Sequence, residues 1–322
     1  MNHPPYHLRV NKSVDRFLLI DLLGQLQKKF DLSEYTYYGF GGPFLEDCRL
    51  INHYFPEIRI VSIEKDLDTY KRQEFHRFTR NLYIEHIDFD DFLAGFSGAG
   101  KSIFWLDFTN FNLACFHEFM ALLDAVDDYS IVRITLMANI PKYLLKDNVS
   151  TKTIKDYMIR FKEKFRPVIP SSFNESCFAL PANYIRLIQD MIRVQAEKAL
   201  PAAGDNVFQI LNSAYYSDGT TMLSLTGIIS PLSELDSVNR LFQDWPHANL
   251  DWKDPLPIDL PILSIKERLK LERLLPSIDI ECQDLSSALG YKIAGDDCAN
   301  LQKLDRYRYF HRYYPSFAKI II

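Results

Sequence analysis

YYGFGGPFLED, residues 37–47, is the stretch of sequence that decides the fold. Residues 36–40 are mostly aromatic and suit a β-strand. Residues 44–55 have the apolar spacing of a helix, with Glu46 and Asp47 in its first turn, where negative charge is favourable. The glycines in between mark a tight loop whose backbone can approach a ligand closely. The stretch therefore predicts a strand, a ligand-binding loop and a helix in direct succession.

The same alternation of short apolar strands and helices continues along the chain. Strands are expected at 58–63, 82–87, 103–106 and 129–138, and helices at 11–30, 66–78 and 112–126. Strands that alternate with helices are typical of a parallel sheet covered on both faces. The sequence thus predicts an α/β fold built on a mostly parallel, Rossmann-like sheet.

A hairpin is expected to end this sheet. Asp218-Gly219 joins two β-rich runs, 207–216 and 221–229, and this dipeptide is a strong signal for a hairpin turn. Two helical stretches, 151–165 and 181–200, come before it. They predict a helical insertion between the parallel strands and an antiparallel closing pair.

The domain boundaries follow from these patterns. We expect a Rossmann-like domain over 1–232, with its helical insertion over about 141–203. From about Pro231, prolines and tryptophans punctuate an irregular link. Residues 233–322 are therefore expected to form a linker and a small C-terminal helical unit, which could be winged-helix-like.

Acidic residues close the strands that follow the glycine loop, namely Glu64, Asp88 and Asp107. In an open parallel sheet, ligands bind outside the carboxyl ends of the strands. An acid after the second strand can accept both hydroxyls of a ribose. For Asp88, the cap of a following helix is an alternative interpretation.

Four segments, in order, resemble motifs one to four of the class I S-adenosylmethionine-dependent methyltransferases. They are YYGFGGPFLED (37–47), IRIVSIEKD (58–66), YIEHIDFDDF (83–92) and SIFWLDFTNF (102–111). The resemblance covers roughly residues 35–112, and the expected hairpin is similar to the last two strands of that family. It implies S-adenosylmethionine as the cofactor and methyl transfer as the activity.

The resemblance also implies roles for particular residues. The methionine part of the cofactor would lie on the loop, the ribose hydroxyls on the acid after the second strand, and the adenine beside the third motif. The cofactor-binding set is Tyr38, Gly39, Phe40, Gly41, Gly42, Glu64, Lys65, Asp88, Phe89 and Asp107.

The chain departs from the family pattern at the loop. Tyr37 or Tyr38 stands where the family usually has an acid, and the loop reads GFGG followed by Pro43 instead of GxGxG. A non-catalytic partner or sensor protein that binds S-adenosylmethionine is therefore the first alternative to an active methyltransferase.

The catalytic candidates follow the fourth strand. Methyl transfer depends mainly on alignment of the reactants, and a base is needed only where the acceptor must lose a proton. Such a group would lie among Asp107, Thr109 and Asn110. The Pro-Pro-aromatic sequence expected for methylation of exocyclic base amines is absent there, and a small molecule, a protein and an RNA all stay open as acceptors.

A competing motif occurs at residues 95–102, GFSGAGKS, which fits the phosphate-binding pattern GxxxxGK[ST]. A nucleotide hydrolase that uses Lys101 is the second alternative function. That mechanism needs a strand before the loop and a helix after it. Here a buried strand is expected after the loop, so a plain connection from a helix to a strand is favoured.

The C-terminal tail interleaves basic and aromatic residues over 303–319, among them Arg306, Arg308 and Lys319. Such a mixture can bind a nucleic acid backbone and stack on bases. The formal net charge of −5 favours the other interpretation, in which the aromatic residues pack on the protein.

Other features limit the class of protein. The amino terminus has no signal-peptide pattern, and the apolar runs are too short to span a bilayer. The five cysteines are scattered without a CxxC pair, so neither a disulfide framework nor a metal site is expected. Buried free thiols and a cytoplasmic protein are expected instead.

Overall fold

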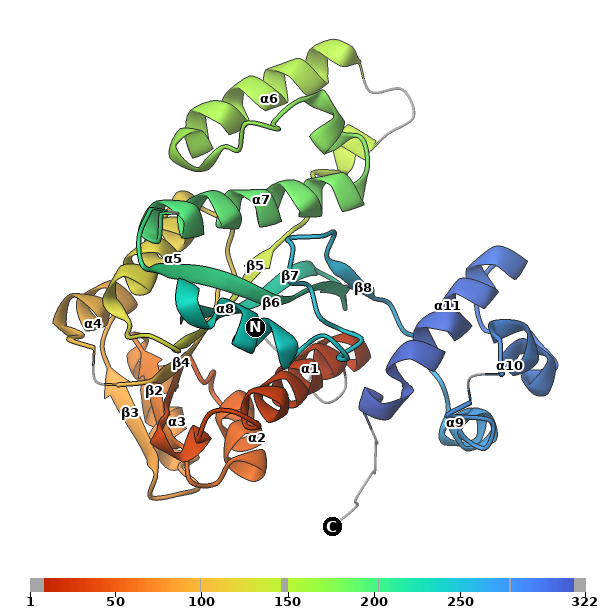
Figure 1. Cartoon of the computed structure of the whole chain (residues 1–322). Coiled ribbons are helices and arrows are strands. Elements are labelled where there is room, and N and C mark those ends of the chain that lie inside the picture. Colours follow the sequence, from red (N-terminus) through yellow and green to blue (C-terminus); the bar gives the residue numbers. More distant parts are fainter. Residues whose placement is uncertain (1–8, 99, 146–149, 202, 278, 316–322) are drawn as a thin grey trace. The chain divides into compact units, whose positions relative to one another are not determined.

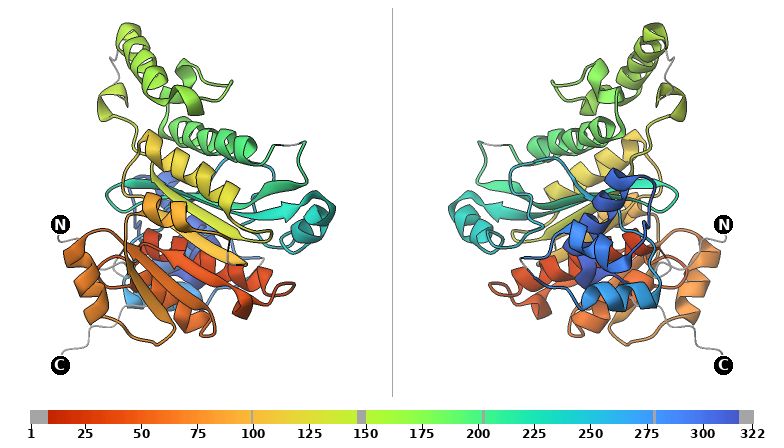
Figure 2. Two further views of the ribbon diagram at one scale, coloured as in Figure 1. Left: turned by 90° about the vertical axis from the view of Figure 1, so that its left-hand side faces the viewer. Right: turned by 90° about the vertical axis from the view of Figure 1, so that its right-hand side faces the viewer.

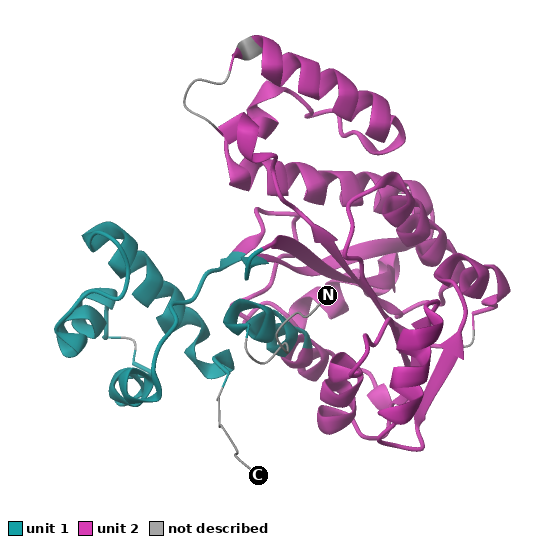
Figure 3. Cartoon of the chain, turned by 180° about the vertical axis from the view of Figure 1, so that it is seen from behind, with its two compact units in different colours: residues 1–19, 216–219, 257–322 teal, residues 20–215, 220–256 magenta. Residues whose placement is uncertain are grey.

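The computed structural model describes residues 9–98, 100–145, 150–201, 203–277 and 279–315. The chain forms two compact units, shown in separate colours in Figure 3. Unit 1 contains residues 1–19, 216–219 and 257–322, and unit 2 contains residues 20–215 and 220–256. The division into separately folding domains at residues 232 and 233 stays a prediction.

An eight-stranded sheet is the framework of the fold, in the order β3-β2-β1-β4-β5-β7-β6-β8 (Figure 1). The strands are β1 (Thr36–Gly39), β2 (Arg59–Glu64), β3 (Leu82–His86), β4 (Ser102–Asp107), β5 (Ile131–Met137), β6 (Asn206–Ser217), β7 (Thr221–Pro231) and β8 (Leu256–Ile258).

The first five strands pair in parallel, and β7 pairs antiparallel with β5. The chain runs outward from β1 through β2 to β3 and then crosses back to β4 on the other side of β1. This reversal is the topological switch point at which doubly wound sheets bind their ligands. The predicted fold class, a mostly parallel Rossmann-like sheet that ends in an antiparallel hairpin, is confirmed.

Helices cover both faces of the sheet. The α-helices of the described residues are α1 (Val10–Leu26), α2 (Glu46–Tyr54), α3 (Leu67–Phe75), α4 (Phe89–Gly95), α5 (Leu113–Ala125), α6 (Thr151–Phe165), α7 (Pro181–Ala199), α8 (Leu235–Arg240), α9 (Ile265–Glu272), α10 (Cys282–Leu289) and α11 (Asp297–Phe310), of which the last three belong to unit 1.

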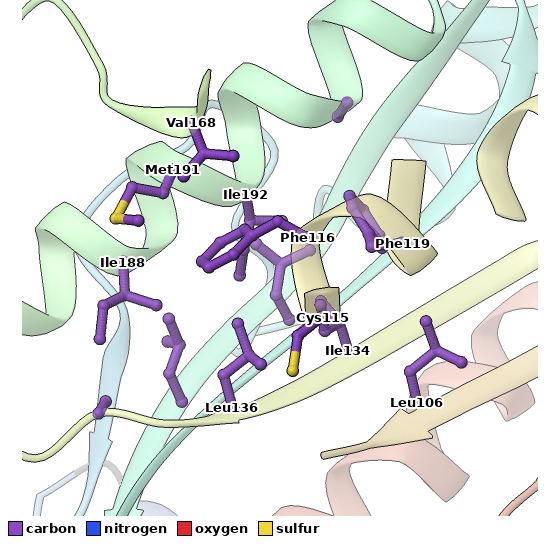
Figure 4. Packing of buried hydrophobic residues seen from close by; sticks show 14 of the residues in the cluster. Leu106, Cys115, Phe116, Phe119, Ile134, Leu136, Val168, Ile188, Met191 and Ile192 are labelled. Atoms are coloured by element: carbon purple, nitrogen blue, oxygen red, sulfur yellow. The ribbon is translucent and has the colours of Figure 1, made fainter. Parts of the chain in front are cut away.

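The main core lies between the sheet and the helices α5 and α7. Alternate residues of β4 and β5, such as Leu106 and Ile134, point to this face because successive strand residues face opposite sides. Figure 4 shows Ile134 of β5 below Phe116 of α5, with Ile188 of α7 on the same side of the sheet. The core thus holds the strand ends of β4 and β5 in place.

The helical insertion extends this layer. In Figures 1 and 2, α7 lies next to α5, and α6 lies on the outer side of α7. Aromatic rings fill the space between α6 and α7, where the ring of Phe161 lies 6.2 Å from that of Tyr184 of α7 and 5.6 Å from that of Phe178 in the turn before α7, measured between centroids. The predicted insertion is therefore a packed subdomain on one face of the sheet.

Unit 1 contains the C-terminal helices α9, α10 and α11. Tyr307 and Phe310 of α11 are fully buried, and the hydroxyl of buried Tyr314 accepts the Leu263 amide at 2.9 Å. Among the described residues of 264–315, the chain forms helices and no strand of a wing. Residues 316–319 of the predicted nucleic-acid segment lie outside the described residues.

The cysteines are all free, but they are not all buried. Cys48 and Cys115 are buried as expected, whereas Cys177 and Cys282 are partly exposed and Cys298 is exposed. The expectation of buried thiols is therefore wrong for these three, of which Cys177 packs only against the margin of the core. Of the helices in the described part of the chain, none has the length and apolarity needed to cross a membrane.

Candidate active site at the carboxyl ends of the strands

The glycine loop and two of the strand-end acids lie at one edge of the sheet. Gly39, the last residue of β1, pairs with Ser62 of β2 on one side and with Trp105 of β4 on the other. Glu64 and Asp107 follow these partners by two residues and end their strands. The acids therefore flank the loop at the switch point, as the sequence predicts for a cofactor site.

The loop adopts a backbone that favours glycine. Gly41 and Gly42 have φ values of 59° and 58°, in the left-handed region. The Gly42 amide donates to the Phe40 carbonyl at 2.6 Å, which makes the turn tight. At Gly39, a Cβ atom would lie 2.7 Å from the Tyr37 hydroxyl, so Tyr37 uses the space that the missing side chain leaves.

Glu64 presents a fixed carboxyl group at the end of β2. Its Oε1 atom accepts the Asp66 amide at 2.8 Å. Burial raises the pKa of Glu64 above its ordinary value, since the charged form loses solvation there. The side chain is thus held in place beside the loop and is partly shielded from water.

Lys65 and Asp88 form an ion pair next to Glu64, with 3.1 Å between Nζ and Oδ2. The hydrogen bond from Lys65 holds the pKa of Asp88 below its usual range, and the Asp90 amide, which donates to Oδ1, adds to this effect. Asp88 is also the N-cap of α4. The alternative interpretation of Asp88 as a helix cap is therefore correct in the structure, while its position beside Lys65 keeps it at the site.

Three phenylalanines join the motifs at this edge. The ring of Phe40 lies 5.5 Å from that of Phe89 and 5.7 Å from that of Phe108, measured between centroids. Tyr38, in contrast, is buried and stacks on Phe104 at 4.5 Å. Phe40, which is partly exposed, thus lies against Phe89, whereas the side chains of Tyr38 and Phe89 are both buried in the core and leave only their backbones for a ligand.

The catalytic candidates lie where β4 gives way to α5. Asp107 is half-buried at the strand end, and Thr109 and Asn110 are exposed in the loop that follows. Phe111 of the same loop packs 4.7 Å from Phe165 of the insertion, between ring centroids. The insertion therefore anchors the loop that carries Thr109 and Asn110.

Two residues of this region give no signal in the sequence. Glu118 of α5 is half-buried, and burial, together with the charges of Asp90 and Asp88, raises its pKa to about 7. Gln73 of α3 is fully buried and bonds to the backbone of the glycine loop. Both reach the site from helices that otherwise look like ordinary amphipathic elements.

The competing motif at 95–102 lies at the opposite edge of the sheet. It leads from α4 into β4, and Ser102, the first residue of β4, pairs with Thr36, the first of β1. Lys101 forms an ion pair with Glu34 at 2.9 Å. A strand follows the loop where a phosphate-binding loop needs the amino end of a helix, so the motif lacks the required geometry.

No group of three or more His, Cys, Asp or Glu side chains that could hold a metal ion occurs within the part of the chain that the structure describes.

Residues 4–322 match the model of a family described as "Putative O-methyltransferase". Among curated proteins, nothing matches the chain.

The solved structures that match this chain are distant from it. The plantazolicin methyltransferase BamL, in complex with a triazolic desmethylPZN analog and SAH, has 10% identity and a TM-score of 0.40, over 69% of this chain and 88% of that one. A probable spermidine synthase from Corynebacterium glutamicum has 11% identity and a TM-score of 0.43, over 79% and 81%. A 16S rRNA (adenine(1408)-N(1))-methyltransferase from Catenulisporales acidiphilia, with cosubstrate SAM, has 12% identity and a TM-score of 0.34, over 66% and 92%. At this distance the likenesses identify no ligand of the present chain.

Proposed function

The chain belongs to this O-methyltransferase family, and we propose that it transfers a methyl group from S-adenosylmethionine to an oxygen atom of its acceptor. One observation carries the proposal. The glycine loop at the end of β1 lies between Glu64 and Asp107, at the point where the strand order reverses. In open α/β sheets this point is where nucleotide-type cofactors bind.

The residues present at this edge fit such a cofactor. Gly41 and Gly42 adopt left-handed φ values that glycine accepts without strain, and this sets the tight turn of the backbone that would lie against the ligand. The fixed carboxyl group of Glu64 would accept hydrogen bonds from the ribose hydroxyls. Phe89 is buried against the ring of the partly exposed Phe40, so it would support the adenine ring next to Asp88 from within the core. The proposed cofactor-binding set is therefore the one that the sequence predicts, with Tyr38 acting through its backbone.

The reaction itself asks little of the protein. S-adenosylmethionine, when bound, supplies a methyl group already activated on a sulfonium. The chain must hold the acceptor oxygen in line and exclude water, and the half-buried end of β4 lies where this would happen. We assign Asp107 as the base that takes the proton from the acceptor hydroxyl, with Thr109 and Asn110 as orienting groups. With the cofactor bound, the acceptor oxygen would take the methyl group as the S–CH3 bond breaks, and the hydroxyl proton would pass to the carboxylate of Asp107.

Isothermal titration with S-adenosylmethionine, S-adenosylhomocysteine and ATP tests the proposal. We expect micromolar-range binding of the first two, on the order of a typical cofactor affinity, and loss of most of it in Glu64→Ala. Glu57→Ala is the matched control, because Glu57 is an exposed acid just before β2, at the other edge of the sheet. ATP binding alone, unaffected by Glu64→Ala, would overturn the proposal.

Turnover separates the enzyme from a cofactor-binding sensor protein. Automethylation or methylation of hydroxyl-bearing small molecules, proteins and RNA, followed with a labelled methyl group, would identify the acceptor class. Label transfer that Asp107→Asn abolishes while cofactor binding persists supports the proposed role of Asp107.

The free cysteines agree with a reducing, cytoplasmic setting. A nucleic acid contact through 303–319 stays a prediction, and the burial of Tyr307, Phe310 and Tyr314 leaves few rings there for stacking.

A further inference from the structure

Gln73 makes three hydrogen bonds beneath the glycine loop. Its Nε2 atom donates to the carbonyl of Phe40 at 3.2 Å and to that of Gly42 at 3.0 Å. Its Oε1 atom accepts the hydroxyl of Ser62, a buried residue of β2, at 2.8 Å. The side chain of Gln73 is fully buried, so these contacts are made away from water, where an unmade bond is costly.

These contacts decide which backbone groups of the loop face outward. In a trans peptide the C=O of one residue and the N–H of the next point in opposite directions. The Phe40 carbonyl points inward to Gln73. The Gly41 N–H therefore points away from Gln73, toward the outer side of the loop. The Gly42 carbonyl also points to Gln73, and the next residue, Pro43, has no N–H to lose.

The position of the loop is equally constrained. A Cβ atom on Gly41 would lie 2.3 Å from the Ser62 hydroxyl, 2.9 Å from Leu45 and 3.3 Å from Nε2 of Gln73. The loop backbone therefore rests directly on the pair formed by Ser62 and Gln73. This pair comes from β2 and α3, outside the glycine motif.

We propose that Gln73 is the positioning residue of the cofactor site, which turns the Gly41 amide outward so that it can donate to an anionic group of the ligand, such as the carboxylate of its methionine part. This inference rests on the proposed function. The chain departs from the family pattern before the loop, because tyrosines stand where the family usually has an acid. In this chain the polar side chain of Gln73, from α3, holds the loop instead.

A second buried glutamine provides a matched control. Gln189 of α7 is fully buried too, and its Nε2 atom donates to the carbonyls of Trp252 and Lys253, at 3.3 and 2.9 Å. It thus makes the same kind of contact with a loop that contains no predicted site residue. Any effect that comes only from removing a buried amide should appear equally in both positions.

The test compares Gln73→Met with Gln189→Met in the full chain. Both should unfold at lower denaturant concentration than the wild type. Only Gln73→Met should weaken S-adenosylhomocysteine binding, by about tenfold or more. A tenfold loss of affinity corresponds to the loss of about one hydrogen bond between the loop and the ligand. Equal affinity in the two variants would overturn the proposal.

Gln73→Glu supplies a readout that a purely structural role would not change. The carboxylate would face two carbonyl oxygens, whereas its protonated form can donate to one of them. The ratio of variant to wild-type affinity should therefore recover as the pH falls from about 8 to about 6, since burial raises the pKa of such a group. A ratio independent of pH contradicts the proposal, and Ser62→Ala, a smaller change, replaces Gln73→Met if that variant does not fold.

Hydrogen exchange separates this inference from the proposed function. If the wild type binds neither S-adenosylmethionine nor S-adenosylhomocysteine, the proposed function fails. The amides of residues 40–42, 44 and 45 should even then exchange faster in Gln73→Met than in Gln189→Met, because the loop loses the hydrogen bonds that hold it to α3. Unchanged exchange in that segment would overturn the positioning role by itself.

Discussion

Two glycine-rich loops of this protein match ligand-binding motifs in the sequence, and the fold places them at opposite edges of the sheet. The loop at 39–43 leaves β1 at the carboxyl edge of the sheet and leads toward α2. The loop at 95–102 leaves α4 and enters β4 at the amino edge. The first has acids on the neighbouring strand ends, while in the second the Gly100 amide is taken by Asp127 at 2.9 Å and Lys101 by Glu34.

The difference lies in what surrounds the glycines, because both loops contain positive φ values. Gly41 rests on Ser62 and Gln73, which hold it from beneath, whereas a Cβ on Gly100 would meet nothing within 4 Å. A glycine pattern therefore marks a binding loop only where the next element and the sheet edge supply the other half of the site.

The largest expected effect comes from adding one methyl group to each loop. Gly41→Ala combines an unfavourable φ with a collision and should lower the free energy of unfolding by about 3 kcal/mol and abolish S-adenosylhomocysteine binding. Gly100→Ala has only the unfavourable φ of 90° and should cost about 1 kcal/mol with binding intact. Denaturant unfolding and titration calorimetry measure both, and equal loss of binding in the two variants would remove the distinction between the loops.

A smaller effect is expected from Glu118, which lies near the charges of the first loop's edge. Its pKa is raised from 4.5 to about 7, chiefly by burial, so the folded state keeps a proton that the unfolded state releases. Stability should therefore fall as the pH rises from about 4.5 to about 7 and then level off. Glu118→Gln should remove this slope and raise the free energy of unfolding at pH 8 by about 1 kcal/mol, allowing for solvent screening of a half-buried group. Unfolding curves at several pH values measure it, and an unchanged slope would contradict the assignment.

The smallest effect is expected at the second loop. Lys101→Ala removes an ion pair with the exposed Glu34 and a cation–π contact with Tyr35 at 5.9 Å, and it should lower the free energy of unfolding by less than about 1 kcal/mol. S-adenosylhomocysteine binding should be unchanged in the same preparation. A marked loss of any nucleotide binding in Lys101→Ala would restore the phosphate-loop hypothesis.

Local patterns predicted most of the fold. The alternation of strands and helices, the Asp218-Gly219 hairpin and the two insertion helices all appear within a few residues of the expected bounds. Elements without a local signal were missed. β8, with Pro257 at its centre, forms because it pairs with a sheet edge, and α8 is a short helix without strong periodicity.

The sequence by itself determined which chemical groups the candidate site offers. The periodicity of the apolar residues predicts where each strand ends, and the sequence has Gly39, Glu64 and Asp107 at those ends. Only the tertiary structure decided what supports them. Three features of the site depend on contacts between segments that become neighbours only when the sheet forms. They are the packing of Tyr38 in the core, the ion pair of Asp88 with Lys65 and the burial of Gln73 under the glycine loop. A polar residue on a helix has no local pattern that reports its burial, since burial is a property of the packed chain.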